Sequence, residues 1–121
     1  MAFQMLFPGA PAIYYGDEIG MTGENDPGCR GGMAWDRQDD GLLAWQRSLI
    51  ALRKAHPALR TGSYIPLLAD DSRRLFAFAR QDASERITAV FNAGDLPQTW
   101  DSAGEFVHVL PHSVRIIQRT V

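Results

Sequence analysis

The sequence predicts a mainly β protein, in which a small antiparallel β-sandwich follows a strand–loop–helix segment. Three observations support this fold class. Short alternating apolar segments separated by turn residues fill the second half of the 121-residue chain. One pattern with the period of a helix lies just before them, at residues 42–55. Nine of the 11 glycines lie in residues 1–62, so the first half is rich in loops. We divide the chain into residues 1–58 and residues 59–121.

Length and composition exclude several classes of protein. A closed eight-stranded α/β barrel needs about 250 residues, so the chain cannot be a complete barrel enzyme. With 45% hydrophobic and 21% charged residues, it is not a disordered protein. A net charge of −2 argues against nucleic acid as a partner, and the absence of any long apolar stretch argues against a membrane span. The single cysteine fits a reducing compartment, so we expect a cytoplasmic location.

The first elements are short. Residues 2–7 have the length of the last turns of a helix, and Pro8-Gly9 interrupts the chain. Residues 11–15 form a continuous apolar run, which predicts a strand of a parallel sheet that is buried on both faces. The chain offers this strand no parallel neighbours, which indicates that the rest of such a sheet lies elsewhere.

A long loop and a helix follow. Residues 16–38 contain six glycines and predict a loop of a length that is usually functional or disordered. In residues 42–55 the apolar side chains recur at helical spacing, and either Asp39 or Asp40 is placed to cap the N-terminus. Pro57 prevents the helix from continuing. The apolar stripe of this helix consists of Leu42, Trp45, Leu49 and Leu52, widened by Leu43 and Ile50.

The rest of the chain predicts short β-strands separated by turns. Phe76 and Phe78 are two residues apart and therefore face the same side of their strand, as do Ile87, Ala89 and Phe91. Turns at this spacing favour an antiparallel sandwich or a small barrel. The expected strands are Tyr64–Leu68, Leu75–Arg80, Ile87–Asn92, a weak strand at Gln98–Trp100, Phe106–Leu110 and Val114–Gln118.

Two groups of charged residues could take part in chemistry. Asp17 and Glu18 follow the predicted strand, but neighbours on an extended chain point to opposite faces, so we expect one to be structural and the other solvated. Asp26 and Arg30 are four residues apart and share a face if the loop is locally helical. They form either a structural ion pair or a fork that accepts from and donates to sugar hydroxyl groups.

The remaining polar and aromatic candidates are weaker. The three histidines (His56, His108 and His112) are scattered, and Cys29 has no cysteine or histidine at ligand spacing, so we expect neither a metal site nor a cofactor. Trp45 belongs to the helical stripe and is expected in the core. Trp35 is the best candidate for an exposed ring that stacks on a sugar, and Trp100 stays undecided.

The first half of the chain resembles a known family. Residues 6–21, with the sequence LFPGAPAIYYGDEIGM, resemble the eighth-strand motif of the α-amylase family of glycoside hydrolases. Residues 23–36, which include Gly23-Glu24-Asn25-Asp26-Pro27, and residues 42–59 are similar to the neopullulanase and cyclomaltodextrinase branch. Residues 62–121 resemble the C-terminal β domain of that family in position and pattern only.

This resemblance implies a fold and a function. Residues 1–7 would end the seventh barrel helix, residues 11–15 would be the eighth strand and residues 42–55 the eighth helix. The family hydrolyses α-glucosidic bonds with retention, and its three catalytic carboxylates lie on earlier strands, so none is expected in this chain. Asp26 and Arg30 match an Asp and an Arg that contact glucose units of the substrate. Gly31-Gly32 departs from the Arg-Pro that relatives often carry there.

Three hypotheses follow from these expectations. The leading one is a C-terminal part of an α-glucan hydrolase, inactive alone, whose partner in the full-length enzyme is an α-glucan oligosaccharide. The alternative is a stand-alone β module that binds carbohydrate or another protein. A third is self-association, driven by apolar surface that residues 1–38 expose when the rest of the barrel is missing.

Overall fold

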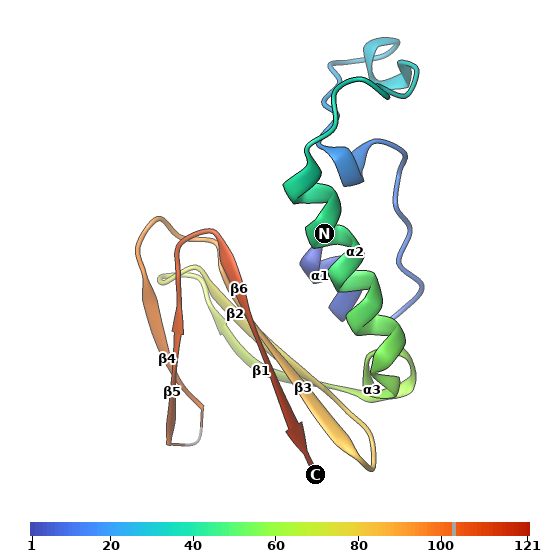
Figure 1. Ribbon diagram of the computed structural model, residues 1–121. Helices are drawn as coiled ribbons and strands as arrows, with labels where there is room; N and C mark the ends of the chain where they lie inside the picture. The colour runs from blue at the N-terminus through green and yellow to red at the C-terminus, as the bar shows by residue number, and fades with distance from the viewer. Residues whose placement is uncertain (103) are drawn as a thin grey trace.

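The computed structural model describes residues 1–102 and 104–121. An antiparallel sheet in the order β1-β2-β3-β6 is covered by a β4–β5 hairpin on one face and by helices on the other (Figure 1). The strands are β1 (Ser63–Asp70), β2 (Leu75–Gln81), β3 (Glu85–Asn92), β4 (Gln98–Ser102), β5 (Glu105–Val109) and β6 (Ser113–Thr120). The α-helices are α1 (Ala2–Leu6), α2 (Asp40–Ala55) and α3 (Pro57–Thr61), with short 3-10 helices η1 (Asp17–Ile19) and η2 (Gly28–Arg30) between α1 and α2.

Each face of the four-stranded sheet has its own core, because alternate side chains of a strand point to opposite faces. Phe78 on β2 is paired with Ala89 on β3, and both face the helices. Their neighbours Ala77 and Val90 are also paired and face the hairpin. The helix-side core comprises Leu6, Ala58, Leu59, Phe78, Ile87 and Ala89, and the hairpin-side core comprises Ala77, Val90, Val107 and Val109.

The predicted fold class is confirmed. The described chain is mainly β, and a strand occupies each of the six segments between residues 62 and 121 where the sequence predicts one. Phe76 and Phe78 share a face, as do Ile87, Ala89 and Phe91, and all five belong to the helix-side core or pack against it. The predicted helix at residues 42–55 is α2, which begins two residues earlier.

Asp39 is the residue that caps α2. Its Oδ1 accepts a hydrogen bond from the backbone N–H of Leu42 at 2.9 Å, whereas Asp40 lies inside the first turn. We expect Asp39→Ala to lower the free energy of unfolding by about 1 kcal/mol, because one N-terminal N–H loses its acceptor. Urea denaturation measures this loss, and Asp40→Ala is the control. Equal losses in the two variants would contradict the assignment of the cap.

Two arginines hold the N-terminal segment against the rest of the chain. Arg80 on β2 is buried, and its guanidinium donates to the carbonyl oxygens of Leu59 at 2.9 Å, Gly62 at 2.8 Å and Leu6 at 3.3 Å. Arg53 on α2 donates to the carbonyls of Met5, Phe7 and Gly9. Helices of five residues are too short to be stable alone, so these bonds account for the placement of α1 and α3.

The strand predicted at residues 11–15 is wrong for this chain. The segment is extended but forms no strand, and Ile13, Tyr14 and Tyr15 are exposed. A strand exists only through hydrogen bonds to a neighbour. The four-stranded sheet lies beyond α2, and nothing in the described residues pairs with residues 11–15.

Trp45 is also misplaced by the prediction. Its ring is 42% exposed, whereas Gln46, which the sequence analysis did not place in the core, is 2% exposed. The buried side of α2 is rotated toward Gln46 and Leu49 because α2 packs mainly against α1, η1 and α3. The side-chain oxygen and nitrogen of Gln46 have no hydrogen-bond partner among the described residues.

The predicted boundary at residues 58 and 59 falls inside α3, a helix that the sequence did not predict. Pro57 stops α2 but begins α3, because its fixed φ angle suits the first turn of a helix. His56 joins this junction to the sheet, with Nδ1 2.6 Å from the Oε2 of Glu85 on β3. The division into residues 1–58 and 59–121 stays a prediction.

No helix in the described part of the chain is long and apolar enough to cross a membrane.

Candidate functional site

The glycine-rich loop projects from the N-terminal end of α2, away from the sheet (Figure 1). It comprises residues 20–38, the part of the predicted loop that joins η1 to α2 and contains η2. The two ends of the loop lie together, because the N–H of Asp39 donates to the carbonyl oxygen of Ile19 at 3.2 Å. The loop therefore rests on a fixed base, which α2 provides.

A turn at Gly16 positions the start of the loop. Gly16 has a φ of 91°, and a Cβ at this position would lie 2.6 Å from the Sδ of Met21, so only glycine fits. The carboxylate of Glu18 accepts a hydrogen bond from the N–H of Gly16 at 2.9 Å. Asp17 is exposed. The sequence prediction that one of the two acids is structural and the other solvated is confirmed.

Asp26 and Arg30 are brought together as the spacing predicts. The Nη2 of Arg30 lies 3.1 Å from the Oδ2 of Asp26, and the two side chains are 72% and 59% exposed. A helical turn produces this arrangement, because the N–H of Arg30 donates to the carbonyl of Pro27 at 2.9 Å. An ion pair this exposed contributes little to stability, so a role in fold stability does not account for it well.

A small pocket of about 180 Å³ lies between this turn and residues 14–17. Its wall includes Tyr14, Asp17 and Cys29. The hydroxyl of Tyr15 donates to the carbonyl of Gly31 at 2.7 Å and so ties the loop to the preceding segment. The side chains of Tyr14 and Tyr15 also share a hydrogen bond that favours the protonated hydroxyl of Tyr14, and this bond is the main cause that raises the pKa of Tyr14. The pocket is smaller than the 300–1,000 Å³ typical of ligand sites, so these groups form one wall of a site at most.

The two candidate tryptophans, Trp35 and Trp100, differ in their exposure to solvent. Trp35 lies in the same loop and is 75% exposed, which agrees with its prediction as an exposed ring. Trp100 on β4 is half-buried and packs against the hairpin-side core, so it is less available to a sugar than Trp35.

The histidines lie in three separate places. His56 is bound to Glu85, His112 lies 2.8 Å from the Oδ1 of Asp95, and His108 is 2.9 Å from the hydroxyl of Thr99. Within residues 1–102 and 104–121, no group of three or more histidine, cysteine or acidic side chains is arranged to hold a metal ion.

Comparison with known proteins identifies relatives of this chain. No family model matches the chain. It is 43% identical over 111 residues to a cyclomaltodextrinase of Geobacillus thermopakistaniensis, a match that covers 87% of this chain and 19% of that relative. It is 40% identical over 99 residues to neopullulanase 2 of Thermoactinomyces vulgaris, covering 80% of this chain and 17% of that relative. The chain thus spans about a fifth of the length of these curated relatives.

Comparison with solved structures also finds enzymes that act on α-glucans. The ligand-free cyclic α-maltosyl-(1→6)-maltose hydrolase of Arthrobacter globiformis superimposes with a TM-score of 0.89 at 32% sequence identity, covering 99% of this chain and 28% of that one. The chain matches the C-terminal part of α-amylase family glycoside hydrolases. The A. globiformis enzyme has also been solved in complex with its cyclic tetrasaccharide and with maltose, so this α-amylase family relative binds α-glucan oligosaccharides.

Several residues that shape this α-amylase family segment have no signal in the sequence. The bonds of Tyr15 to Gly31 and of Glu18 to Gly16 depend on how the loop folds back. Arg53 and Arg80 bind backbone carbonyls, which no side-chain pattern reveals. The resemblance of residues 6–21 is the only sequence feature that marks the turn at Gly16.

Proposed function

We propose that the chain is the C-terminal part of a retaining α-glucan hydrolase and that Asp26 and Arg30 bind the substrate in the complete enzyme. The observation that carries the proposal is the exposed Asp26–Arg30 pair, which lies on a loop within the segment similar to α-glucan hydrolases. Trp35, exposed in the same loop, is suited to stack on a glucose ring.

The chemistry of the pair suits sugar recognition. The carboxylate of Asp26 accepts hydrogen bonds and the guanidinium of Arg30 donates them, so together they bind two adjacent hydroxyl groups of a glucose unit. Neither group transfers a proton or attacks the sugar in this role. They hold the substrate, and the groups that break the bond come from elsewhere in the enzyme.

We expect the 121-residue chain to be inactive on starch, pullulan and cyclodextrin. Retaining hydrolysis needs a nucleophile and an acid/base carboxyl group about 5–5.5 Å apart. The adjacent acids Asp17 and Glu18 do not supply this pair, because Glu18 is held by the amide of Gly16 while Asp17 faces solvent. A reducing-sugar assay checks the expectation, with a whole cyclomaltodextrinase as positive control. Sugar release by the pure chain would overturn this part of the proposal.

The role of the pair is tested in a chimera. The matched region of the Geobacillus cyclomaltodextrinase is replaced by this chain, which leaves the rest of that enzyme in place. We expect Asp26→Asn to lower kcat/KM on cyclodextrin by about 10- to 100-fold, because a charge-assisted bond to the sugar is lost.

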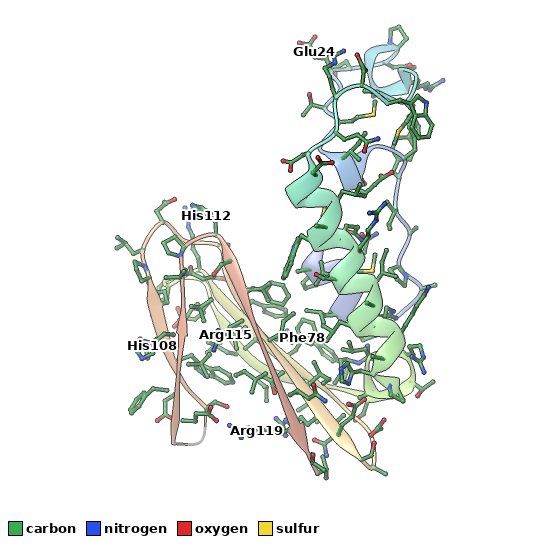
Figure 2. The ribbon with its side chains drawn as sticks, viewed as in Figure 1. Glu24, Phe78, His108, His112, Arg115 and Arg119 are labelled. Atoms are coloured by element: carbon green, nitrogen blue, oxygen red, sulfur yellow. The ribbon has the colours of Figure 1, made fainter. Side chains whose placement is uncertain are left out.

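Glu24→Gln is the matched control, since Glu24 is an exposed acid of the same loop with no ion pair among the described residues (Figure 2). It should leave kcat/KM within about twofold. If the complete chimera does not fold, residues 20–38 alone are transplanted. Equal activity of the Asp26→Asn and Glu24→Gln variants would contradict a substrate role.

Self-association through residues 1–38 stays a prediction.

A further inference from the structure

A second cleft lies far from the loop, between β5 and β6. Its volume is about 480 Å³, which is in the range of small-ligand sites. Four consecutive residues of each strand line it, residues 105–108 and residues 115–118. Because consecutive side chains point to opposite faces, a cleft lined in this way is walled by the backbones of both strands as well as by side chains.

The backbone walls have unused hydrogen-bonding capacity. β5 pairs only with β4, and β6 pairs only with β3, so the edges of β5 and β6 that face each other belong to no ladder in the described residues. The two strands diverge from their turn near His112 (Figure 1). A third strand would have to stay about 4.8 Å from both edges, so a wedge of this shape suits a compact ligand better than an extended peptide.

Positive charge is concentrated at this cleft. Arg115 lines it, and among the described residues the guanidinium of Arg115 makes no ion pair or hydrogen bond. Arg119, four residues further along β6, points to the same face and reaches across to Glu105 on β5 (Figure 2). Arg86 of β3 stands directly opposite Arg119 in the ladder, and its one side-chain partner in the described part of the chain is the neutral side chain of Gln81.

This arrangement is unfavourable without a counter-ion. Like charges directly opposite each other in a ladder repel. Among the described residues, the ion pair between Glu105 and Arg119 is the one that any of these three arginines makes. Glu85, the other nearby acid on β3, points to the helix face and is bound to His56. Guanidinium groups and unpaired N–H groups are the donors that bind carboxylate and phosphate oxygens best.

We propose that the β5–β6 cleft binds an oxyanion, the phosphate or carboxylate group of a small ligand, through Arg115 with support from Arg119. The half-buried side chain of Ile117 lines the cleft and offers apolar surface to the carbon skeleton of such a ligand. The cleft shares no residue with the Asp26–Arg30 pair, so a failure of this proposal would not contradict the proposed function, and the reverse is also true.

The test is a titration of the complete ¹⁵N-labelled chain, followed by NMR at constant ionic strength. The probes are inorganic phosphate, glucose 1-phosphate and citrate, with glucose as the uncharged control. We expect amide shifts at residues 105–108 and 115–118 with the anions and none there with glucose. A preference for glucose 1-phosphate indicates a phosphate ester as the ligand, and a preference for citrate indicates a carboxylate.

Variants separate this site from general charge attraction. Arg115→Gln should weaken binding at least about tenfold, because it removes a charge-assisted donor. Arg47→Gln, at an exposed arginine of α2 with no partner among the described residues, should leave binding unchanged. Glu105→Gln should tighten binding about two- to fivefold, since it frees Arg119. Shifts spread over all exposed arginines, equal loss in the first two variants, or binding of an acidic peptide but of none of the small anions would overturn the proposal.

Discussion

Phe78→Ala is expected to lower the free energy of unfolding by about 3–5 kcal/mol, the usual cost of removing a fully buried phenylalanine. Phe78 has no exposed surface and lies between the sheet and the helices (Figure 2). Its ring is 5.6 Å from that of Phe7 in an edge-to-face arrangement and 5.8 Å from that of Phe91 in a stacked one. The substitution therefore opens a cavity where the N-terminal segment meets the sheet.

The matched control is Phe106→Ala on β5, because Phe106 is 68% exposed and its removal creates no cavity. It should change the free energy of unfolding by less than about 0.5 kcal/mol. Urea denaturation of both variants gives the comparison, and Phe78→Leu, which fills part of the space, should fall between them. Similar losses for Phe78→Ala and Phe106→Ala would show that the aromatic cluster does not organise the core.

Arg80→Met is expected to cost about 2–4 kcal/mol, although methionine is apolar and similar in length. The side chain of Arg80 is the shared donor for the carbonyls of Leu6 in the last turn of α1, Leu59 in the last turn of α3 and Gly62 just beyond α3. Helices leave the carbonyl groups of their last turn unpaired. Without it, these buried acceptors lose their partner, and each unsatisfied group is costly. Burial is the main cause that lowers the pKa of Arg80, and the charge of Arg53 adds to it.

Arg47→Met provides the control for this substitution, since Arg47 is exposed and makes no bond among the described residues. Arg80→Lys keeps the charge, but a single ammonium group reaches the three carbonyls less well, so it should restore only part of the loss. Proteolysis near Pro8-Gly9 offers a second measurement, because release of α1 should expose this segment. Wild-type stability of Arg80→Met would contradict a clamping role.

The β part of the fold could be predicted because the information is local. Alternation in residues 75–80 and 87–92 shows which side chains share a face, and turn residues separate the strands. The helix at residues 42–55 has an equally local signal in its apolar spacing and its N-terminal acids. These features need no knowledge of distant partners.

The sequence predictions are wrong where the structure of a segment depends on the element that it packs against or pairs with. Residues 11–15 have the composition of a buried strand, yet no strand in residues 1–102 and 104–121 pairs with them, so Ile13, Tyr14 and Tyr15 remain exposed. Trp45 and Gln46 are adjacent on α2, and the packing of α1 and η1 determines that Gln46 is buried in place of Trp45. Helical spacing gives the width of an apolar stripe but does not fix its rotation.

In the candidate site, too, local contacts could be predicted from the sequence and contacts between distant residues could not. The spacing of Asp26 and Arg30 correctly predicts that they meet, because one helical turn brings them together. The contacts that hold the loop, from Tyr15 to Gly31 and from Glu18 to Gly16, join residues whose types suggest no pairing. Substrate binding by the pair follows from the resemblance and stays a prediction.

The two ends of the glycine-rich loop are held together, so the sequence between them can be exchanged. The backbone bond from Asp39 to Ile19 fixes the distance between its ends, whatever lies between them. Doubling the length of such a loop costs only about 0.6 kcal/mol of closure entropy. Residues 20–38 can therefore be replaced by longer or shorter sequences while α2 and the sheet beneath it keep their structure. Under the proposed function, such a replacement would change substrate binding without disturbing the fold.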